Sequence, residues 1–197
     1  MYRSTGDIFD NPESYRQIFR SQLPKLGTSA PQCYNDMDML TVGMYGKGLV
    51  GTTGCGDADY RSQFALWCMC SAPLMLGCDI RVMNEETRKL VTNSDLIRID
   101  QDLEARPPMA TRHPWNENYV TLLKHLDDGT YALGFFNMDE SDGELFATFS
   151  DFGLPAKAGY DVAVRSVFDP EDAGCFREYM RVKVPAHDCR IYLARLV

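Results

Sequence analysis

The sequence predicts an α/β segment followed by an all-β segment. Three observations carry this prediction: apolar runs alternate with helical patterns over the first hundred residues, the hydrophobic period changes near Pro107-Pro108, and the later segments alternate apolar and polar residues between turns. We place the boundary near residue 105, which divides the chain into segments 1–105 and 106–197.

Three helices are expected in the first segment. The first begins at Asn11, an N-cap residue followed by a proline and an acid, and its apolar side chains recur at spacings of three and four. The second begins at Asp57 or Asp59 and is apolar nearly all round, which predicts a helix enclosed in a core. The third begins at Asn84.

Short apolar runs lie between or after these helices, at residues 38–42, 74–78 and 96–99. Strands that alternate with helices at this spacing indicate βα units and a parallel sheet. About three units are too few to close a barrel. Half of a parallel sheet would expose an unpaired edge, so we expect another chain to cover it or the sequence to be a fragment.

After the boundary the sequence predicts an antiparallel β-sandwich of six short strands. The segments between them are rich in Asp, Gly and Pro, which is turn chemistry, and no helical pattern intervenes. The strands are expected at residues 119–123, 131–137, 145–149, 160–168, 176–184 and 191–196.

Composition excludes several classes of protein. The 197 residues are 45% hydrophobic, which excludes a disordered chain, and no apolar run is long enough for a membrane span. A net charge of −8 argues against nucleic acid or anionic lipid as partners. Seven cysteines favour a reducing compartment over a disulfide framework, and no secretory leader opens the sequence, so we expect a cytoplasmic location.

Asp7, just before the first helix, is the first candidate for chemistry. It is either an ordinary loop acid or a carboxylate at the C-terminal end of a barrel strand, where such enzymes place catalytic groups. Arg3 is expected on the same rim, where its guanidinium would bind sugar hydroxyls or hold a carboxylate.

Asp36 and Asp38 form a D-x-D pair. In an extended segment both side chains point to one face, so the two acids would converge. Three interpretations stay open: a turn into a strand, the metal-binding pair of a nucleotide-sugar transferase, or sugar recognition at a barrel mouth. The metal interpretation lacks a third acid or histidine nearby.

Other candidate motifs favour structural roles. Residues 43–56 are rich in glycine, but Lys47 is followed by Gly48, so the Walker pattern fails and a mobile loop is expected. Cys68 and Cys70 are expected in the core, and the three histidines have no ligand spacing. We therefore expect neither a metal nor a cofactor.

Four motifs in order resemble the family 27 glycoside hydrolases, the α-galactosidase and α-N-acetylgalactosaminidase group. Arg3-Ser4-Thr5-Gly6-Asp7-Ile8 resembles the family's Arg-x-x-(Gly/Ala)-Asp-Ile segment, and Tyr34-Asn35-Asp36-Met37-Asp38-Met39-Leu40 resembles its Trp-Asn-Asp-Pro-Asp-Met-Leu segment. Leu66-Trp67 with Ala72-Pro73-Leu74 and Cys78-Asp79-Ile80-Arg81 is similar to the next helix and last barrel strand. Ile99-Asp100-Gln101-Asp102 resembles the barrel exit.

The resemblance implies the last part of a (β/α)8 barrel, about strands 6–8, followed by a C-terminal antiparallel β-sandwich. It further implies that Asp7 is the general acid/base of a retaining hydrolysis and that Arg3, Asp38 and Met39 bind the sugar, with Asp36 in support of Asp38. The substrate would be an α-galactoside oligosaccharide or glycoconjugate; galactose, N-acetylgalactosamine and arabinopyranose are not distinguished.

The family's nucleophile lies in a Lys-x-Asp-x-Cys segment that this sequence does not contain. Catalysis would therefore need a chain that supplies the other half of the barrel, and the exposed half-barrel edge also favours self-association. The competing hypothesis is a non-catalytic sugar-binding or structural β-domain protein, in which aromatics such as Trp115 or Tyr119 stack on sugar faces.

Overall fold

A computed structural model of the protein describes the backbone of residues 1–197 and every side chain except those of Arg112 and Ala156. The chain divides into two compact units, Met1–Pro107 and Pro108–Val197, here called the N-terminal unit and the C-terminal unit. In the part of the chain that is described, no helix combines the length and apolar character that crossing a bilayer requires.

The N-terminal unit contains four α-helices, two short parallel strands and two 3-10 turns among its described residues. In chain order these are β1 (Tyr2–Arg3), α1 (Pro12–Gln22), a 3-10 turn (Leu23–Thr28), β2 (Asn35–Asp36), α2 (Asp57–Met69), a 3-10 turn (Ile80–Val82), α3 (Glu85–Val91) and α4 (Ser94–Asp100).

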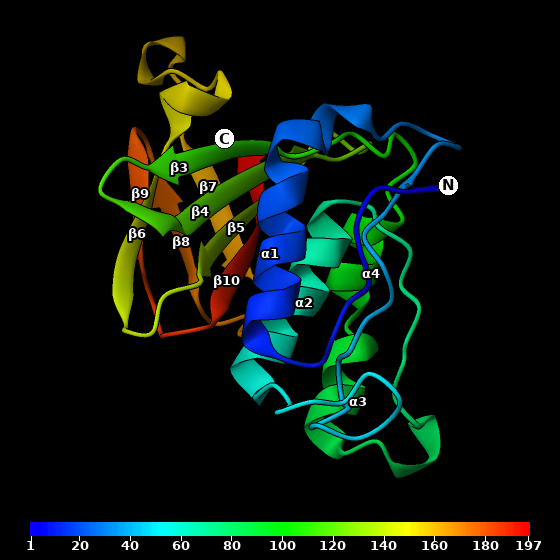
Figure 1. Ribbon diagram of the computed structural model, residues 1–197. Coiled ribbons are helices and arrows are strands. Elements are labelled where there is room, and N and C mark those ends of the chain that lie inside the picture. Colours follow the sequence, from blue (N-terminus) through cyan, green and yellow to red (C-terminus); the bar gives the residue numbers. More distant parts are fainter. The chain divides into compact units, whose positions relative to one another are not determined.

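The expected helix starts are confirmed. The side chains of Asn11 and Asn84 accept hydrogen bonds from the backbone N–H groups of Ser14 and Thr87, which caps α1 and α3. Helix α2 begins at Asp57, lies beside α1 and is buried along most of its length, as its apolar surface predicts (Figure 1).

The strand expected at residues 96–99 is wrong, because these residues belong to helix α4. Asn93 caps this helix by accepting from the N–H of Leu96, while Leu96 and Ile99 are the residues it buries. Their spacing of three is that of one helix face, and the run is too short for its apolar residues alone to distinguish helix from strand.

The strands expected at residues 38–42 and 74–78 reduce to one parallel bridge between Leu40 and Leu76. The N–H of Leu40 donates to the carbonyl oxygen of Met75, and the N–H of Gly77 donates to that of Leu40. The parallel pairing of β1 with β2 and this bridge agree with a parallel α/β arrangement, but neither segment forms a ladder of its own.

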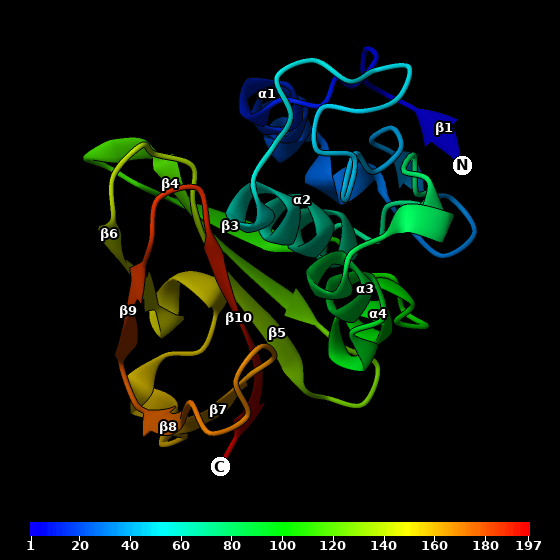
Figure 2. The same ribbon diagram turned by 90° about the horizontal axis from the view of Figure 1, so that it is seen from below.

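The C-terminal unit is built from two antiparallel sheets. A six-stranded sheet has the order β3-β4-β5-β10-β7-β8, and a two-stranded sheet pairs β6 with β9 (Figure 2). The strands are β3 (Met109–His113), β4 (Asn116–His125), β5 (Tyr131–Asn137), β6 (Gly143–Thr148), β7 (Val162–Ser166), β8 (Ala173–Phe176), β9 (Tyr179–Val184) and β10 (Cys189–Leu196).

The two sheets enclose one apolar core, which confirms the β-sandwich. Phe135 and Tyr192 of the larger sheet share this core with Leu145 and Val182 of the smaller one. The expected strand 176–184 is in fact two strands, because β8 joins the large sheet and β9 the small one. Strand β3 was not predicted.

Candidate active site

The parallel pair β1–β2 brings two distant segments together. Its register places Tyr2 opposite Asn35 and Arg3 opposite Asp36. Because the strands run parallel, the residues that follow both of them emerge at the same end, which puts residues 4–8 beside residues 37–39. The candidates Asp7 and Asp38 therefore lie close together although they are 31 residues apart in sequence.

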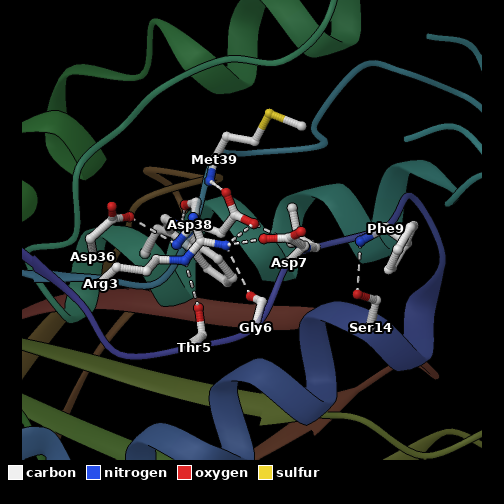
Figure 3. A network of polar contacts seen from close by, with 11 residues as sticks. Arg3, Thr5, Gly6, Asp7, Phe9, Ser14, Asp36, Asp38 and Met39 are labelled. Atoms are coloured by element: carbon white, nitrogen blue, oxygen red, sulfur yellow. Dashed lines mark hydrogen bonds and ion pairs between the residues drawn. The ribbon is translucent and has the colours of Figure 1, made fainter. Parts of the chain in front are cut away.

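Arg3 connects the two candidate acids. Its Nη2 atom donates to Asp38 Oδ2 at 2.5 Å, to Asp7 Oδ1 at 3.1 Å and to the carbonyl oxygen of Gly6 at 3.0 Å, while its Nε donates to the Thr5 hydroxyl at 3.2 Å (Figure 3). One guanidinium nitrogen thus lies between two carboxylates, and charge-assisted bonds of this kind are the stronger ones.

Asp38 is held from several directions. Its Oδ2 also accepts from the backbone N–H of Ile8 at 2.7 Å, and its Oδ1 accepts from the N–H of Met39 at 2.6 Å. The backbone of Asp38 has φ +77°, the left-handed region that non-glycine residues rarely adopt. Residues in this conformation persist where their surroundings fix them, and they concentrate at functional sites.

The expectation that Asp36 and Asp38 point to one face is wrong. It assumed an extended segment, whereas the left-handed backbone of Asp38 turns its side chain toward Arg3. Asp36 Oδ1 instead accepts the N–H of Asp38 at 2.9 Å. Among the described residues no three His, Cys, Asp or Glu side chains converge as metal ligands. Asp36 Oδ1 and both carboxylate oxygens of Asp38 accept hydrogen bonds from N–H donors.

Met39 contributes its backbone to this cluster. Its N–H donates to Asp38, while its side chain extends away from the carboxylates (Figure 3). The thioether sulfur lies so close to Gly77 that an added Cβ there would be 2.8 Å from it. The absence of a side chain at Gly77 therefore leaves the space that Met39 occupies.

Asp7 is the accessible member of the cluster. Its side chain is 88% exposed, whereas that of Asp38 is 15% exposed. Asp7 and Phe9 line an open groove of about 440 Å³ that runs along α1 past Ser14 and Gln17. The arrangement presents one carboxylate to an incoming ligand and keeps a second one fixed behind it.

Comparison with known proteins identifies the family of the chain. Residues 1–102 match the alpha galactosidase A family, and residues 116–194 match the alpha galactosidase C-terminal beta sandwich domain. The chain belongs to the alpha-galactosidase family. The resemblance to family 27 found in the sequence is thereby confirmed, as is a barrel part followed by a β-sandwich.

Individual alpha-galactosidases match nearly the whole chain. That of Cyamopsis tetragonoloba is 29% identical over 195 residues, which cover 98% of this chain and 44% of that protein; that of Coffea arabica is 30% identical and covers 98% and 48%. The chain spans less than half the length of these curated relatives.

Solved structures show the same fold. Alpha-galactosidase I from Mortierella vinacea superposes with a TM-score of 0.80 at 22% identity, covering 98% of this chain and 52% of that one. The family 27 β-L-arabinopyranosidase from Geobacillus stearothermophilus superposes with a TM-score of 0.85 at 21% identity, covering 99% and 44%.

Two buried residues that hold neighbouring segments in place were not singled out in the sequence of this family member. Trp67, fully buried in α2, donates its indole N–H to the carbonyl oxygen of Asp38 at 2.8 Å. A tryptophan on a helix that is apolar all round could have been singled out, because a buried indole N–H requires an acceptor.

The second such residue, Asp10, anchors the glycine-rich loop. Its carboxylate is 0% exposed and accepts from the N–H of Gly46 at 2.7 Å and from the Tyr60 hydroxyl at 2.9 Å. Its carbonyl oxygen accepts from the N–H of Gly54 at 2.9 Å. Burial is the main cause that raises the pKa of Tyr60, so this hydroxyl remains a donor.

Proposed function

We propose that this chain carries the acid/base half of an α-galactosidase-type retaining active site that hydrolyses terminal α-D-galactosyl residues. The observation that carries the proposal is the single Arg3 nitrogen shared by Asp7 and Asp38, in sequence contexts that match the family. An exposed carboxylate beside a groove and a fixed carboxylate behind it suit the two different tasks of proton transfer and substrate recognition.

Asp7 is proposed as the general acid/base. Within the described part of the chain, Arg3 binds its Oδ1 atom, and Oδ2 accepts no hydrogen bond from the protein. Protonated Asp7 would donate to the glycosidic oxygen as the bond to the anomeric carbon breaks. The resulting carboxylate would then take a proton from the water that releases the sugar.

Arg3 and Asp38 are proposed to bind sugar hydroxyls. The guanidinium donates and the Asp38 carboxylate accepts, so together they suit a hydroxyl that does both. Asp36 is proposed as the support of Asp38 through its bond to the Asp38 N–H. Met39 is proposed to border the same sugar pocket beside Asp38.

Retention requires a second carboxylate about 5 Å from the acid/base, which attacks the anomeric carbon. In this family it belongs to a segment that the present sequence does not contain. We therefore propose that turnover needs a further polypeptide segment carrying that nucleophile, either joined to this chain or supplied by a partner.

Reconstitution tests the proposal. The chain would be joined to, or mixed with, the part of a curated relative that it does not cover, and hydrolysis of p-nitrophenyl α-D-galactopyranoside would be measured. We expect turnover that Asp7→Asn abolishes and that Asp151→Asn, an exposed acid in the C-terminal unit, leaves intact. Absence of turnover in the reconstituted protein would refute the proposal.

The leaving group separates acid catalysis from a structural role. An acid is needed most where the departing oxygen is basic, so Asp7→Asn should slow formation of the intermediate on melibiose far more than on 2,4-dinitrophenyl α-galactoside. A variant that merely distorted the site would slow both substrates to a similar degree, and that outcome would argue against the acid/base role.

A further inference from the structure

The C-terminal unit exposes an aromatic surface that the proposed active site does not use. Trp115, 62% exposed, lies in the two-residue turn between β3 and β4, and its ring centroid is 5.2 Å from that of Phe146 at an interplanar angle of 30°. We call these two rings the aromatic platform. A large exposed apolar side chain is costly in water and is enriched where a ligand covers it.

The buried ring of His113 contacts both rings of the platform. The buried His113 ring lies edge-on to Trp115 at 5.5 Å and to Phe146 at 4.7 Å, and a register shift in the β3–β4 ladder falls between Arg112 and His113. Such an irregularity re-aims the side chains that follow it. Contact with the rings of His113 and Phe146 favours one orientation of the exposed tryptophan before any ligand binds, which lowers the entropy cost of binding.

Hydrogen-bonding side chains border the rings. Phe146 and Glu144 alternate with the inward-facing Leu145 on β6, so both point outward, and their cross-strand partners on β9 are Arg181 and Lys183. Arg181 Nη1 lies 3.7 Å from Glu144 Oε2, a loose ion pair. Glu144 and Lys183 also line an open hollow of about 510 Å³.

We infer that the aromatic platform is an accessory saccharide-binding site, separate from the Arg3–Asp7–Asp38 cluster, that stacks a pyranose ring on Trp115. A pyranose has an apolar C–H face and a rim of hydroxyls, which matches aromatic rings bordered by carboxylate, guanidinium and ammonium groups. The class of ligand, a neutral α-galactoside oligosaccharide or polysaccharide, rests on the proposed function.

The size of the platform favours a sugar over a protein partner. Two aromatic side chains bury at most about 150–250 Å² each, whereas a stable protein interface needs about 800 Å² per partner. A second copy of the chain would need far more apolar surface than these two rings supply. A sugar ring or a short saccharide is covered adequately by an area of this size.

The experiment is affinity electrophoresis of the whole chain in native gels that contain soluble galactomannan. We expect the wild type and Tyr160→Ala, which removes an exposed aromatic outside the platform, to be retarded alike. Trp115→Ala should weaken retardation by about tenfold, the loss expected for one stacked ring. Phe146→Thr, a change that β-strands tolerate, should also weaken retardation. This second variant tests the platform without altering Trp115.

Arg3→Ala, a change in the Arg3–Asp7–Asp38 cluster, distinguishes this inference from the proposed function. It should leave retardation unchanged, because the platform and the cluster are different sites. The inference is overturned if Arg3→Ala abolishes retardation while Trp115→Ala does not, if no protein is retarded, or if Trp115→Ala instead removes a concentration-dependent shift in gel filtration. None of these outcomes bears on turnover by the reconstituted enzyme.

The two tryptophans of the chain provide a second readout. Trp115 is exposed and Trp67 is fully buried beneath Asp38, so acrylamide quenches mainly Trp115. Galactomannan should protect the quenchable fraction in the wild type and in Arg3→Ala. Unchanged quenching at saturating galactomannan would contradict stacking on Trp115.

Discussion

The indole N–H of Trp67 donates to the backbone carbonyl oxygen of Asp38 at 2.8 Å, and the two residues are 29 positions apart in the sequence. This bond joins the core of α2 to the residue whose carboxylate holds Arg3. The bond helps to fix the left-handed backbone of Asp38, from which its carboxylate projects toward Arg3. Trp67 therefore stabilises the candidate active site through the backbone of Asp38.

Trp67→Phe should destabilise the N-terminal unit by about 1–3 kcal/mol, because the Asp38 carbonyl loses its donor and a cavity is left in the core. Urea unfolding followed by circular dichroism measures the change. The control is Trp115→Phe, an exposed position where the free energy of unfolding should change by no more than about 0.5 kcal/mol. Equal losses at the two positions would contradict the role given to Trp67.

Asp38→Gly should retain more stability than Asp38→Ala, by about 1 kcal/mol. Both variants lose the ion pair with Arg3, but only alanine keeps a Cβ in the left-handed conformation at φ +77°. Thermal unfolding of the two variants side by side measures the difference. If alanine proved the more stable replacement, the backbone strain inferred at this position would be absent.

Asp10→Ala should cost about 3 kcal/mol, since the half-buried Gly46 N–H and the buried Tyr60 hydroxyl would both lose their acceptor. Asp10→Asn keeps one side-chain oxygen as an acceptor, so it retains one of these two bonds. It should therefore cost clearly less in the same urea titration. The hypothesis that Asp10 anchors the loop fails if the two variants are equally stable.

Acid should destabilise the C-terminal unit through His113. Burial lowers the pKa of His113, and its Nδ1 has no hydrogen-bond partner among the described residues. The unfolded chain binds a proton below about pH 6.5, whereas the folded ring resists it, so the stabilisation is complete above that pH and is lost as the pH falls.

The comparison of wild type with His113→Phe isolates this effect, because phenylalanine keeps an aromatic ring and removes the titration. Urea midpoints would be measured at about pH 7.5 and about pH 5. The wild type should lose more stability between the two conditions than the variant. Equal losses would show that His113 is not the group responsible.

The parts of the fold that depend on local chemistry could be predicted from the sequence. An asparagine side chain that precedes a helix accepts a hydrogen bond from a free backbone N–H group of the first turn. Both helix starts, at Asn11 and Asn84, were therefore predicted correctly. The apolar segment 131–137, bounded by turn residues on both sides, likewise identified a strand that the structure shows with the same bounds.

The rest depends on contacts between distant segments. Residues 38–42 appear extended in sequence, yet only Leu40 is paired, and the backbone of Asp38 turns left-handed under bonds from Trp67, Arg3 and Ile8. The expected strand 176–184 was divided because its two halves join different sheets. The local sequence pattern does not determine which distant segment will form a given hydrogen bond.

The charges around Arg3 carry a consequence for selectivity. Asp7 and Asp38 bind one guanidinium, and Asp36 adds a third carboxylate on the neighbouring backbone, so acidic groups outnumber the base. A uronic acid presented here would meet electrostatic repulsion that an uncharged hexose does not. If the cluster binds sugar as proposed, its excess of negative charge is expected to disfavour galacturonides.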